Sequence, residues 1–264
     1  MGKLSAKKCF LLDMDGTIYL GNEMIPGADR FLEALTARGV RYIFLTNNSS
    51  KSKVVYLEKL RKMKLPATID NIFTSGEATT IYLNREKPGA RIFLLGTPAL
   101  EEEFVKSGFT LVRGRNEHPD YVILGFDTTL TYEKLWIGCD YIMDGVPYIA
   151  THPDFVCPVE GGRVMPDIGA MIEMIKYSTY GRVPLVIGKP NRYIVDAVLA
   201  KYGLRKEETV IVGDRLYTDI RTGTDNGMDS ILVLSGETDR KMLAETEFAP
   251  TYAFESVKDI IEEL

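Results

Sequence analysis

Residues 8–17 read Lys-Cys-Phe-Leu-Leu-Asp-Met-Asp-Gly-Thr, an apolar run that ends in two carboxylates separated by one residue. Continuous rather than alternating hydrophobicity is typical of a parallel strand that is covered on both faces. Gly16 follows the second carboxylate, and a glycine permits a tight turn after a strand. This stretch therefore predicts a buried strand that delivers Asp13 and Asp15 to one edge of a parallel sheet.

Similar apolar runs recur along the chain, and amphipathic segments lie between them. Further strands are expected at 41–45, 91–95, 121–124, 184–187, 209–212 and 230–234. Helices are expected at 27–38, 53–63 and 192–202, where apolar residues recur at helical spacing. Because strand and helix alternate, the sequence predicts an α/β fold with a doubly wound parallel sheet.

Two short stretches interrupt this alternation and indicate domain boundaries. Residues 86–89 contain a Pro-Gly pair, and residues 180–182 contain a second turn signal just before the strand at 184–187. We expect an outer core built from residues 1–80 and 184–264, with an inserted α/β domain over 81–183. An insertion of about 100 residues is large enough to fold as a unit.

The composition excludes several classes of protein. The 264 residues carry 32 Lys and Arg against 37 Asp and Glu, without long basic runs, which argues against binding to a nucleic-acid backbone. No apolar stretch approaches the roughly 18 residues of a membrane span. The three cysteines are far apart and no signal peptide is visible, so we expect a cytoplasmic protein without disulfides or a membrane partner.

Polar groups follow three other predicted strands, as the two carboxylates follow the first. The residues concerned are Thr46, Asn47 and Asn48 after 41–45, Lys189 after 184–187, and Asp214, with Asp219 beyond it, after 209–212. In open α/β sheets, functional groups gather at the carboxyl ends of the strands. Turn formation would explain each cluster alone, but it does not explain why acids and a lysine stand at different strand ends.

Gathering Asp13, Asp15 and Asp214 at one place requires a cation. Two carboxylates about 4 Å apart repel by roughly 4 kcal/mol at an effective dielectric of 20. Mg²⁺ prefers a few carboxylates together with water and phosphate oxygens, and this all-oxygen cluster offers no nearby thiolate or imidazole. The pattern therefore predicts a magnesium site, to which Lys189 adds positive charge.

The four strand ends together resemble the motifs of the haloacid dehalogenase (HAD) superfamily of phosphohydrolases. The matching segments, in order, are DMDGT, the threonine of LTNNS, the lysine of GKP, and GDRLYTD. An insertion between the second and third motifs is similar to the C2 type of cap domain. The segment IATHPD, taken with GKP and GDRLYTD, resembles the NagD-like branch, often called 4-nitrophenylphosphatases. The resemblance covers essentially the whole chain and implies a Rossmann-like HAD core.

This resemblance implies a role for each matched residue. Asp13 would be the nucleophile and form an aspartyl-phosphate, and Asp15 would be the general acid and base. Thr46 and the backbone near Asn47 and Asn48 would hold phosphate oxygens, and Lys189 would neutralise charge on the nucleophile and the phosphoryl group. The implied metal ligands are Asp13, the Asp15 carbonyl and Asp214, with Asp219 supporting them. The substrate would be a small phosphomonoester, such as 4-nitrophenyl phosphate, a nucleotide monophosphate or a sugar phosphate.

Other points remain open at the level of sequence. His152 and Asp154 in the insertion are candidates for substrate contact, although a solvent-exposed loop would equally explain His152. Arg215 is a candidate phosphate clamp or an ion-pair partner of Asp219. Related capped enzymes often pair through the cap, so a homodimer is one option. A phosphoacceptor or phosphate-binding protein without turnover is the alternative function, although the large insertion would then have no role.

Overall fold

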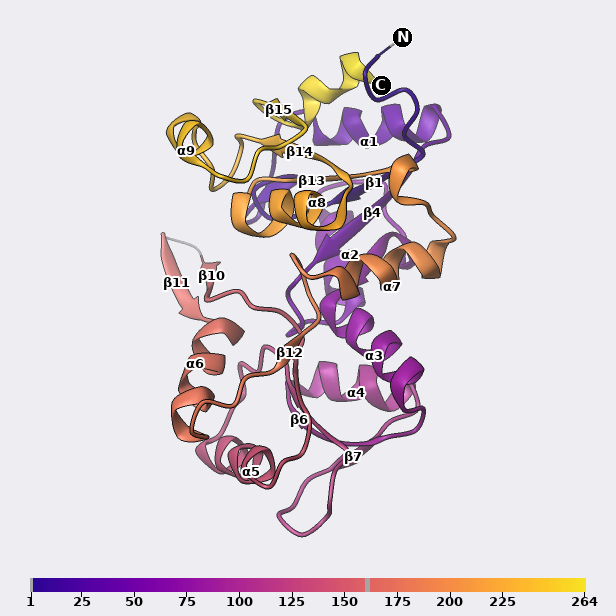
Figure 1. Ribbon diagram of the computed structural model, residues 1–264. Helices are drawn as coiled ribbons and strands as arrows, with labels where there is room; N and C mark the ends of the chain where they lie inside the picture. Colours follow the sequence, from indigo (N-terminus) through magenta and orange to yellow (C-terminus); the bar gives the residue numbers. More distant parts are fainter. Residues whose placement is uncertain (1, 160–161) are drawn as a thin grey trace. The chain divides into compact units, whose positions relative to one another are not determined.

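A computed structural model describes residues 2–159 and 162–264. The chain forms two compact units, each interrupted in sequence. The first contains the residues up to Thr46 together with Lys53–Phe73 and Lys189–Leu264, and the second contains Asn47–Ser52 and Thr74–Gly188. Figure 1 colours the first unit from indigo to violet and from orange to yellow. Within the described residues, no helix has both the length and the apolar character needed to cross a membrane.

A six-stranded sheet forms the centre of the first unit, in the order β15-β14-β13-β1-β4-β5. Its strands are β1 (Cys9–Leu12), β4 (Arg41–Thr46), β5 (Ile72–Thr74), β13 (Thr209–Gly213), β14 (Asp229–Val233) and β15 (Tyr252–Phe254). β1 pairs in parallel with both β4 and β13, and β14 pairs in parallel with β13 and β15. The predicted parallel sheet is therefore confirmed, with β1 near its centre.

Helices cover both faces of this sheet. They are α1 (Ala28–Ala37), α2 (Lys53–Lys62), α7 (Arg192–Tyr202), α8 (Arg221–Asn226) and α9 (Arg240–Glu245), with shorter turns η1 (Ile69–Asn71), η2 (Lys206–Glu208), η3 (Leu216–Ile220) and η4 (Val257–Glu263). Ile231 and Val233 of β14 belong to the apolar cluster that includes α1 and α2. Leu232, between them, packs instead with Leu216 and Ile220 of η3. Side chains that alternate between two covered faces define a doubly wound sheet.

The predicted helix ends agree with the structure. α1 ends at Ala37 and is followed by its C-cap Arg38 and by Gly39 with φ 68°, and α7 ends at Tyr202 with Gly203, φ 64°, as its C-cap. A residue with a side chain rarely adopts this left-handed conformation, so glycine terminates both helices and turns the chain back toward the sheet. A small hairpin of β2 (Tyr19–Leu20) and β3 (Glu23–Met24) follows the loop after β1.

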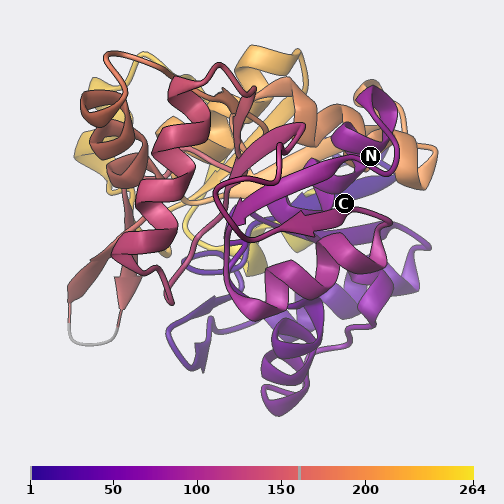
Figure 2. The same cartoon turned by 90° about the horizontal axis from the view of Figure 1, so that it is seen from below.

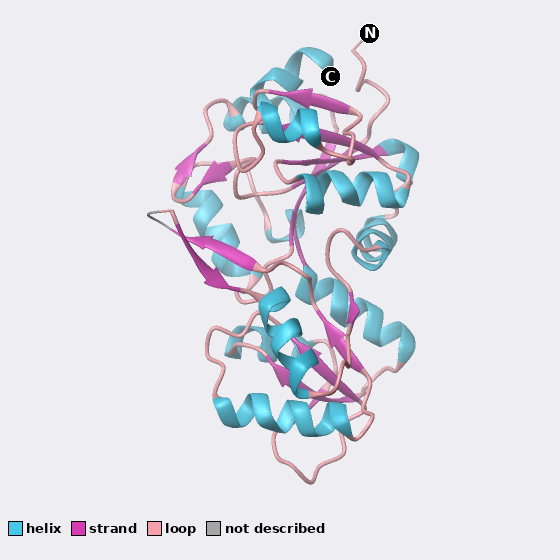
Figure 3. Cartoon of the chain, turned by 60° about the vertical axis from the view of Figure 1, so that its left-hand side comes forward, coloured by secondary structure: helices cyan, strands magenta, loops and turns pink. Residues whose placement is uncertain are grey.

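The second unit contains a five-stranded sheet in the order β12-β9-β8-β6-β7. The strands are β6 (Arg91–Leu95), β7 (Thr110–Val112), β8 (Tyr121–Leu124), β9 (Tyr148–Ala150) and β12 (Leu185–Val186), all paired in parallel. α5 (Tyr132–Met143) and α6 (Ile168–Ser178) pack on one face, while α3 (Ser75–Glu86) and α4 (Pro98–Lys106) lie on the other (Figure 2). β10 (Val156–Val159) and β11 (Arg163–Pro166) form an antiparallel hairpin separate from this sheet (Figure 3).

The structure corrects the assignment of one strand. The expected strand at 184–187 is β12, which pairs with β9 and so belongs to the sheet of the second unit rather than to the outer core. The two compact units part at residues 73/74 and 188/189, whereas the predicted domain boundaries stand at 80/81 and 183/184. A strand's hydrophobicity shows that it is buried but does not show which neighbour it pairs with, because pairing depends on residues distant in sequence.

Candidate active site

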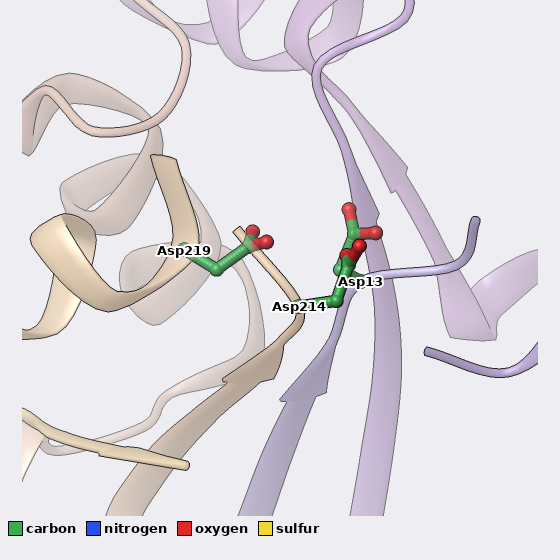
Figure 4. Close-up of side chains that lie close together, drawn as sticks. All are labelled: Asp13, Asp214 and Asp219. Atoms are coloured by element: carbon green, nitrogen blue, oxygen red, sulfur yellow. The ribbon is translucent and has the colours of Figure 1, made fainter. Parts of the chain in front are cut away.

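The sheet places two predicted acids at neighbouring strand ends. β1 and β13 are adjacent with Leu12 opposite Val212, and the Asp13 backbone N–H donates to the Val212 carbonyl at 2.8 Å. Asp13 and Asp214 therefore leave the sheet side by side (Figure 4). Asp219, on η3, points its carboxylate toward them. The three side chains each present an oxygen within 4.8 Å of the others.

Lys189 is buried within this carboxylate cluster. Its side chain is 2% exposed, and Nζ donates to Asp13 Oδ1 at 2.7 Å, to Asp219 Oδ1 at 2.6 Å and to the Leu45 carbonyl at 3.2 Å. An ammonium group has three donors, and these three acceptors match them. Burial disfavours the charged ammonium, but Asp13 and Asp219 outweigh it and hold the pKa of Lys189 above its ordinary value.

The acids have more negative charge than Lys189 can balance. Burial raises the pKa of the Asp13 carboxyl to about 6, although Lys189 opposes the rise. Burial and the nearby Asp13 charge raise the pKa of Asp214 to about 8. Asp214 Oδ2 accepts from the Glu237 backbone N–H at 2.7 Å, whereas its buried Oδ1 has no hydrogen-bond partner among the described residues. A buried carboxylate oxygen that lacks a hydrogen bond and lies beside other carboxylates is suited to bind a divalent cation that prefers oxygen ligands.

Glycines allow the backbone to approach the carboxylates closely. A Cβ added at Gly16 would lie 2.3 Å from Asp214 Oδ2, and one at Gly236 would lie 2.0 Å from the same oxygen. A Cβ at Gly213 would lie 2.2 Å from Asp219 Cγ. Real Cβ contacts are not this short, so any larger residue at these positions would displace the acids. The backbone at these glycines therefore confines the Asp214 and Asp219 carboxylates.

The loop after β14 is a component that the sequence analysis missed. Ser235 Oγ donates to the Gly16 carbonyl at 2.8 Å, and Thr238 Oγ1 donates to the Asp214 carbonyl at 2.5 Å. Together with Gly236 and the Glu237 N–H, these groups hold the Asp214 loop against the loop after β1. The signal was present, because this polar segment also directly follows a predicted strand.

The remaining predicted residues of the first unit occupy different environments. Asp15 is exposed in the turn after β1, where Gly16 has φ 83°. Thr46 is the buried last residue of β4. The Arg215 side chain approaches Glu237 at 3.0 Å, and only its backbone N–H donates to Asp219, at 3.2 Å. The alternative of an ion pair between the Arg215 side chain and Asp219 is therefore wrong, because the neighbouring loop offers Arg215 another carboxylate.

The other predicted residues all lie in the second unit. Asn47 Nδ2 donates to the two Asp154 carboxylate oxygens at 3.1 and 3.2 Å, and Asn48 Oδ1 accepts from the backbone N–H and the hydroxyl of Ser50. His152 is 0% exposed and packs edge-on against Phe126. The alternative that His152 is a solvent-exposed loop residue is therefore wrong.

Two family models match the chain. A haloacid dehalogenase-like hydrolase model matches residues 10–110, and a HAD-hydrolase-like model matches residues 186–260. These ranges contain Asp13, Thr46, Lys189, Asp214 and Asp219. The family matches thus include the residues that the first unit brings together, and Thr46 at the end of β4.

Individual relatives are similar over nearly the whole chain. An acid sugar phosphatase from Staphylococcus aureus is 38% identical over 97% of this chain and 98% of its own length. The crystal structure of a 4-nitrophenylphosphatase from Thermotoga maritima superposes with a TM-score of 0.93 at 43% identity, over 98% of each chain. A glycerol phosphate phosphatase from Mycobacterium tuberculosis, solved in complex with magnesium, gives a TM-score of 0.90 at 29% identity over 98% of this chain and 78% of that one.

Proposed function

Since this chain belongs to the haloacid dehalogenase-like hydrolases and is a phosphatase of the NagD-like type, we propose that it hydrolyses small phosphomonoesters with Mg²⁺ through an aspartyl-phosphate on Asp13. Enzymes of this family use a divalent metal. The names of its relatives favour sugar phosphates as substrates and 4-nitrophenyl phosphate as a convenient reporter. We also propose that the second unit is a C2-type cap.

One observation carries the proposal: the buried Lys189 ammonium lies 2.7 Å from a carboxylate at the end of the central strand. A buried cation at this distance would orient Asp13 and offset the negative charge that an approaching phosphate adds. Neither a turn nor a purely structural ion pair requires a second acid, Asp214, beside the first, with an oxygen that has no hydrogen-bond partner in the part of the chain that the structure describes. The arrangement is suited to a phosphate and a metal ion together.

We propose the following chemistry for the residues of this chain. An Asp13 oxygen forms a bond to phosphorus while the bond between phosphorus and the alcohol oxygen breaks, and Asp15 gives that oxygen a proton. Asp15 then removes a proton from water, whose oxygen attacks phosphorus, and the bond to Asp13 breaks to release phosphate. Asp13, the Asp15 carbonyl and Asp214 would hold the metal, with Asp219 in support. When bound, the metal would neutralise charge on the phosphoryl group.

The decisive experiment measures phosphate release from 4-nitrophenyl phosphate and a panel of sugar phosphates and nucleotide monophosphates, with Mg²⁺ or with a chelator. We expect turnover only with metal, and a loss of more than about 1000-fold in Asp13→Asn. Asp70→Asn is the matched control, because Asp70 is exposed in the first unit away from the sheet edge that carries Asp13. Near-normal turnover by Asp13→Asn would contradict the mechanism. Stoichiometric labelling of Asp13 without release would instead identify a phosphoacceptor.

A further inference from the structure

The segment that follows β4 makes several hydrogen bonds within the second unit. Ser49 Oγ lies 2.9 Å from Thr151 Oγ1 and accepts from the Phe126 backbone N–H, also at 2.9 Å. Thr97 Oγ1 donates to the Ser50 carbonyl at 2.9 Å. Three separate loops of the second unit thus hold residues 49–50, directly after the predicted phosphate-binding residues.

Asn47 is also held by hydrogen bonds within the second unit. It is 5% exposed, its carbonyl accepts from Ser75 Oγ, and its side-chain amide donates to both oxygens of Asp154. A Cβ added at Gly188 would lie 2.6 Å from Asn47 Oδ1, so no larger residue at position 188 would leave this amide where it is. The orientation of the Asn47 side chain is therefore determined from several directions.

Asp154 is itself fixed by its surroundings. Its backbone N–H donates to His152 Nδ1 at 3.3 Å, and its carbonyl accepts from the Gly169 N–H at 2.7 Å. His152 Nε2 lies 3.5 Å from Asp167 Oδ1, which also accepts from the Ile168 N–H at 2.7 Å and so caps α6. The loop that carries Asp154 is thus anchored to the start of α6 by the Gly169 hydrogen bond, and the buried imidazole packs beside it.

We propose that Asp154 is a positioning residue for the phosphate: it holds the Asn47 side chain so that the backbone after Thr46 stays aligned to receive phosphate oxygens. This inference rests on the proposed function, together with the expectation from the family resemblance that Thr46 and the backbone near Asn47 hold phosphate oxygens. It differs from the expectation that Asp154 touches the leaving group. Both Asp154 oxygens already accept from an amide, which suits a clamp on the Asn47 side chain. His152, fully buried, supports the clamp and does not contact the alcohol.

The two roles differ in what they do to inorganic phosphate, because this ligand has no leaving group. A positioning residue changes the affinity for inorganic phosphate and lowers kcat/KM by one common factor for every substrate. A residue that contacts the leaving group changes the ranking of substrates and leaves phosphate affinity unaltered. We therefore measure inorganic phosphate binding by calorimetry in the presence of Mg²⁺, beside kcat/KM for the substrate panel.

In Asp154→Ala, we expect inorganic phosphate to bind about tenfold more weakly, because the buried Asn47 amide loses its acceptors. The same factor should appear in kcat/KM for all substrates. Asp154→Asn keeps one acceptor oxygen and should lose only about threefold, with an unchanged ranking. Asp140→Ala, which removes a half-buried acid of α5 that pairs with Arg115 in the same unit, should match the wild type.

Unaltered phosphate affinity in Asp154→Ala, or a reordered substrate ranking in either Asp154 variant, would overturn the inference while leaving the phosphatase proposal intact. If Asp154→Ala does not fold, Asp154→Asn decides, since wild-type phosphate affinity there also overturns it. A wild-type protein that fails to bind phosphate would overturn the proposed function and this inference with it. In a double-mutant cycle with Asn47→Ala, the two losses should not add, because both residues act through one contact.

Discussion

Replacing Lys189 by methionine removes the charge that balances the carboxylate cluster while keeping most of the side-chain volume. The Nζ atom lies 2.7 Å from Asp13 Oδ1 and 2.6 Å from Asp219 Oδ1. The variant leaves these acids and Asp214 buried together without a cation in contact. We expect both stability and turnover to fall, with stability measured in a chelator so that no metal replaces the lost charge.

The size of the effect follows from these distances. At an effective dielectric of about 20, each of the two attractions amounts to roughly 6 kcal/mol. Burial of the ammonium cancels a large part of this sum, and removing one partner of a buried ion pair costs about 3–5 kcal/mol in proteins of known stability. At about 2–4 °C per kcal/mol for domains of this size, the melting temperature of Lys189→Met should fall by about 10 °C.

The assay is thermal unfolding followed by circular dichroism at about pH 8 in a chelator. The control is Lys8→Met, which removes an exposed lysine beside β1 and should cost less than about 1 kcal/mol. In the double variant Asp13→Asn with Lys189→Met, removing one carboxylate should recover part of the loss. A melting temperature within about 2 °C of the wild type for Lys189→Met would refute the charge-balance argument, and so would turnover near the wild-type rate.

Two further predictions concern the metal. Gly236→Ala puts a Cβ 2.0 Å from Asp214 Oδ2, so the carboxylate must move. We expect kcat to fall about 100-fold and the Mg²⁺ concentration for half-maximal activity to rise. Wild-type values for both quantities would contradict the close-approach argument. In the metal-free chain, the folded-state pKa values of about 6 for Asp13 and about 8 for Asp214 exceed the ordinary aspartate pKa of 3.8. The folded state therefore binds more protons than the unfolded state, and its stability should fall as pH rises from about 4 to about 8. Mg²⁺ should accordingly raise the melting temperature more at about pH 8 than at about pH 5, and equal shifts would show that these acids do not bind it.

Much of the core fold was predictable because its signals are local. The strands β1, β4, β13 and β14 are continuous apolar runs, and the acids at two of their ends are adjacent in sequence to those runs. Because the sheet is parallel, Asp13 and Asp214, which follow adjacent strands, lie together at its carboxyl edge independently of the loop conformations. The short strands β5 and β15 escaped detection, because three residues are too few to show a period.

The sequence alone therefore determined the fold class, the sheet edge where chemistry is concentrated, and the identity of the residues Asp13, Lys189 and Asp214. Only the tertiary structure decided that β12 joins the second sheet, that the backbone at Gly236 approaches Asp214 closely, that Asp154 binds the Asn47 side chain, and that His152 is buried. The physical reason is the range of the interactions. Hydrophobic runs and strand ends depend on residues that are adjacent in sequence. Strand pairing, close approach and burial depend on residues far apart in the chain, which only folding brings together.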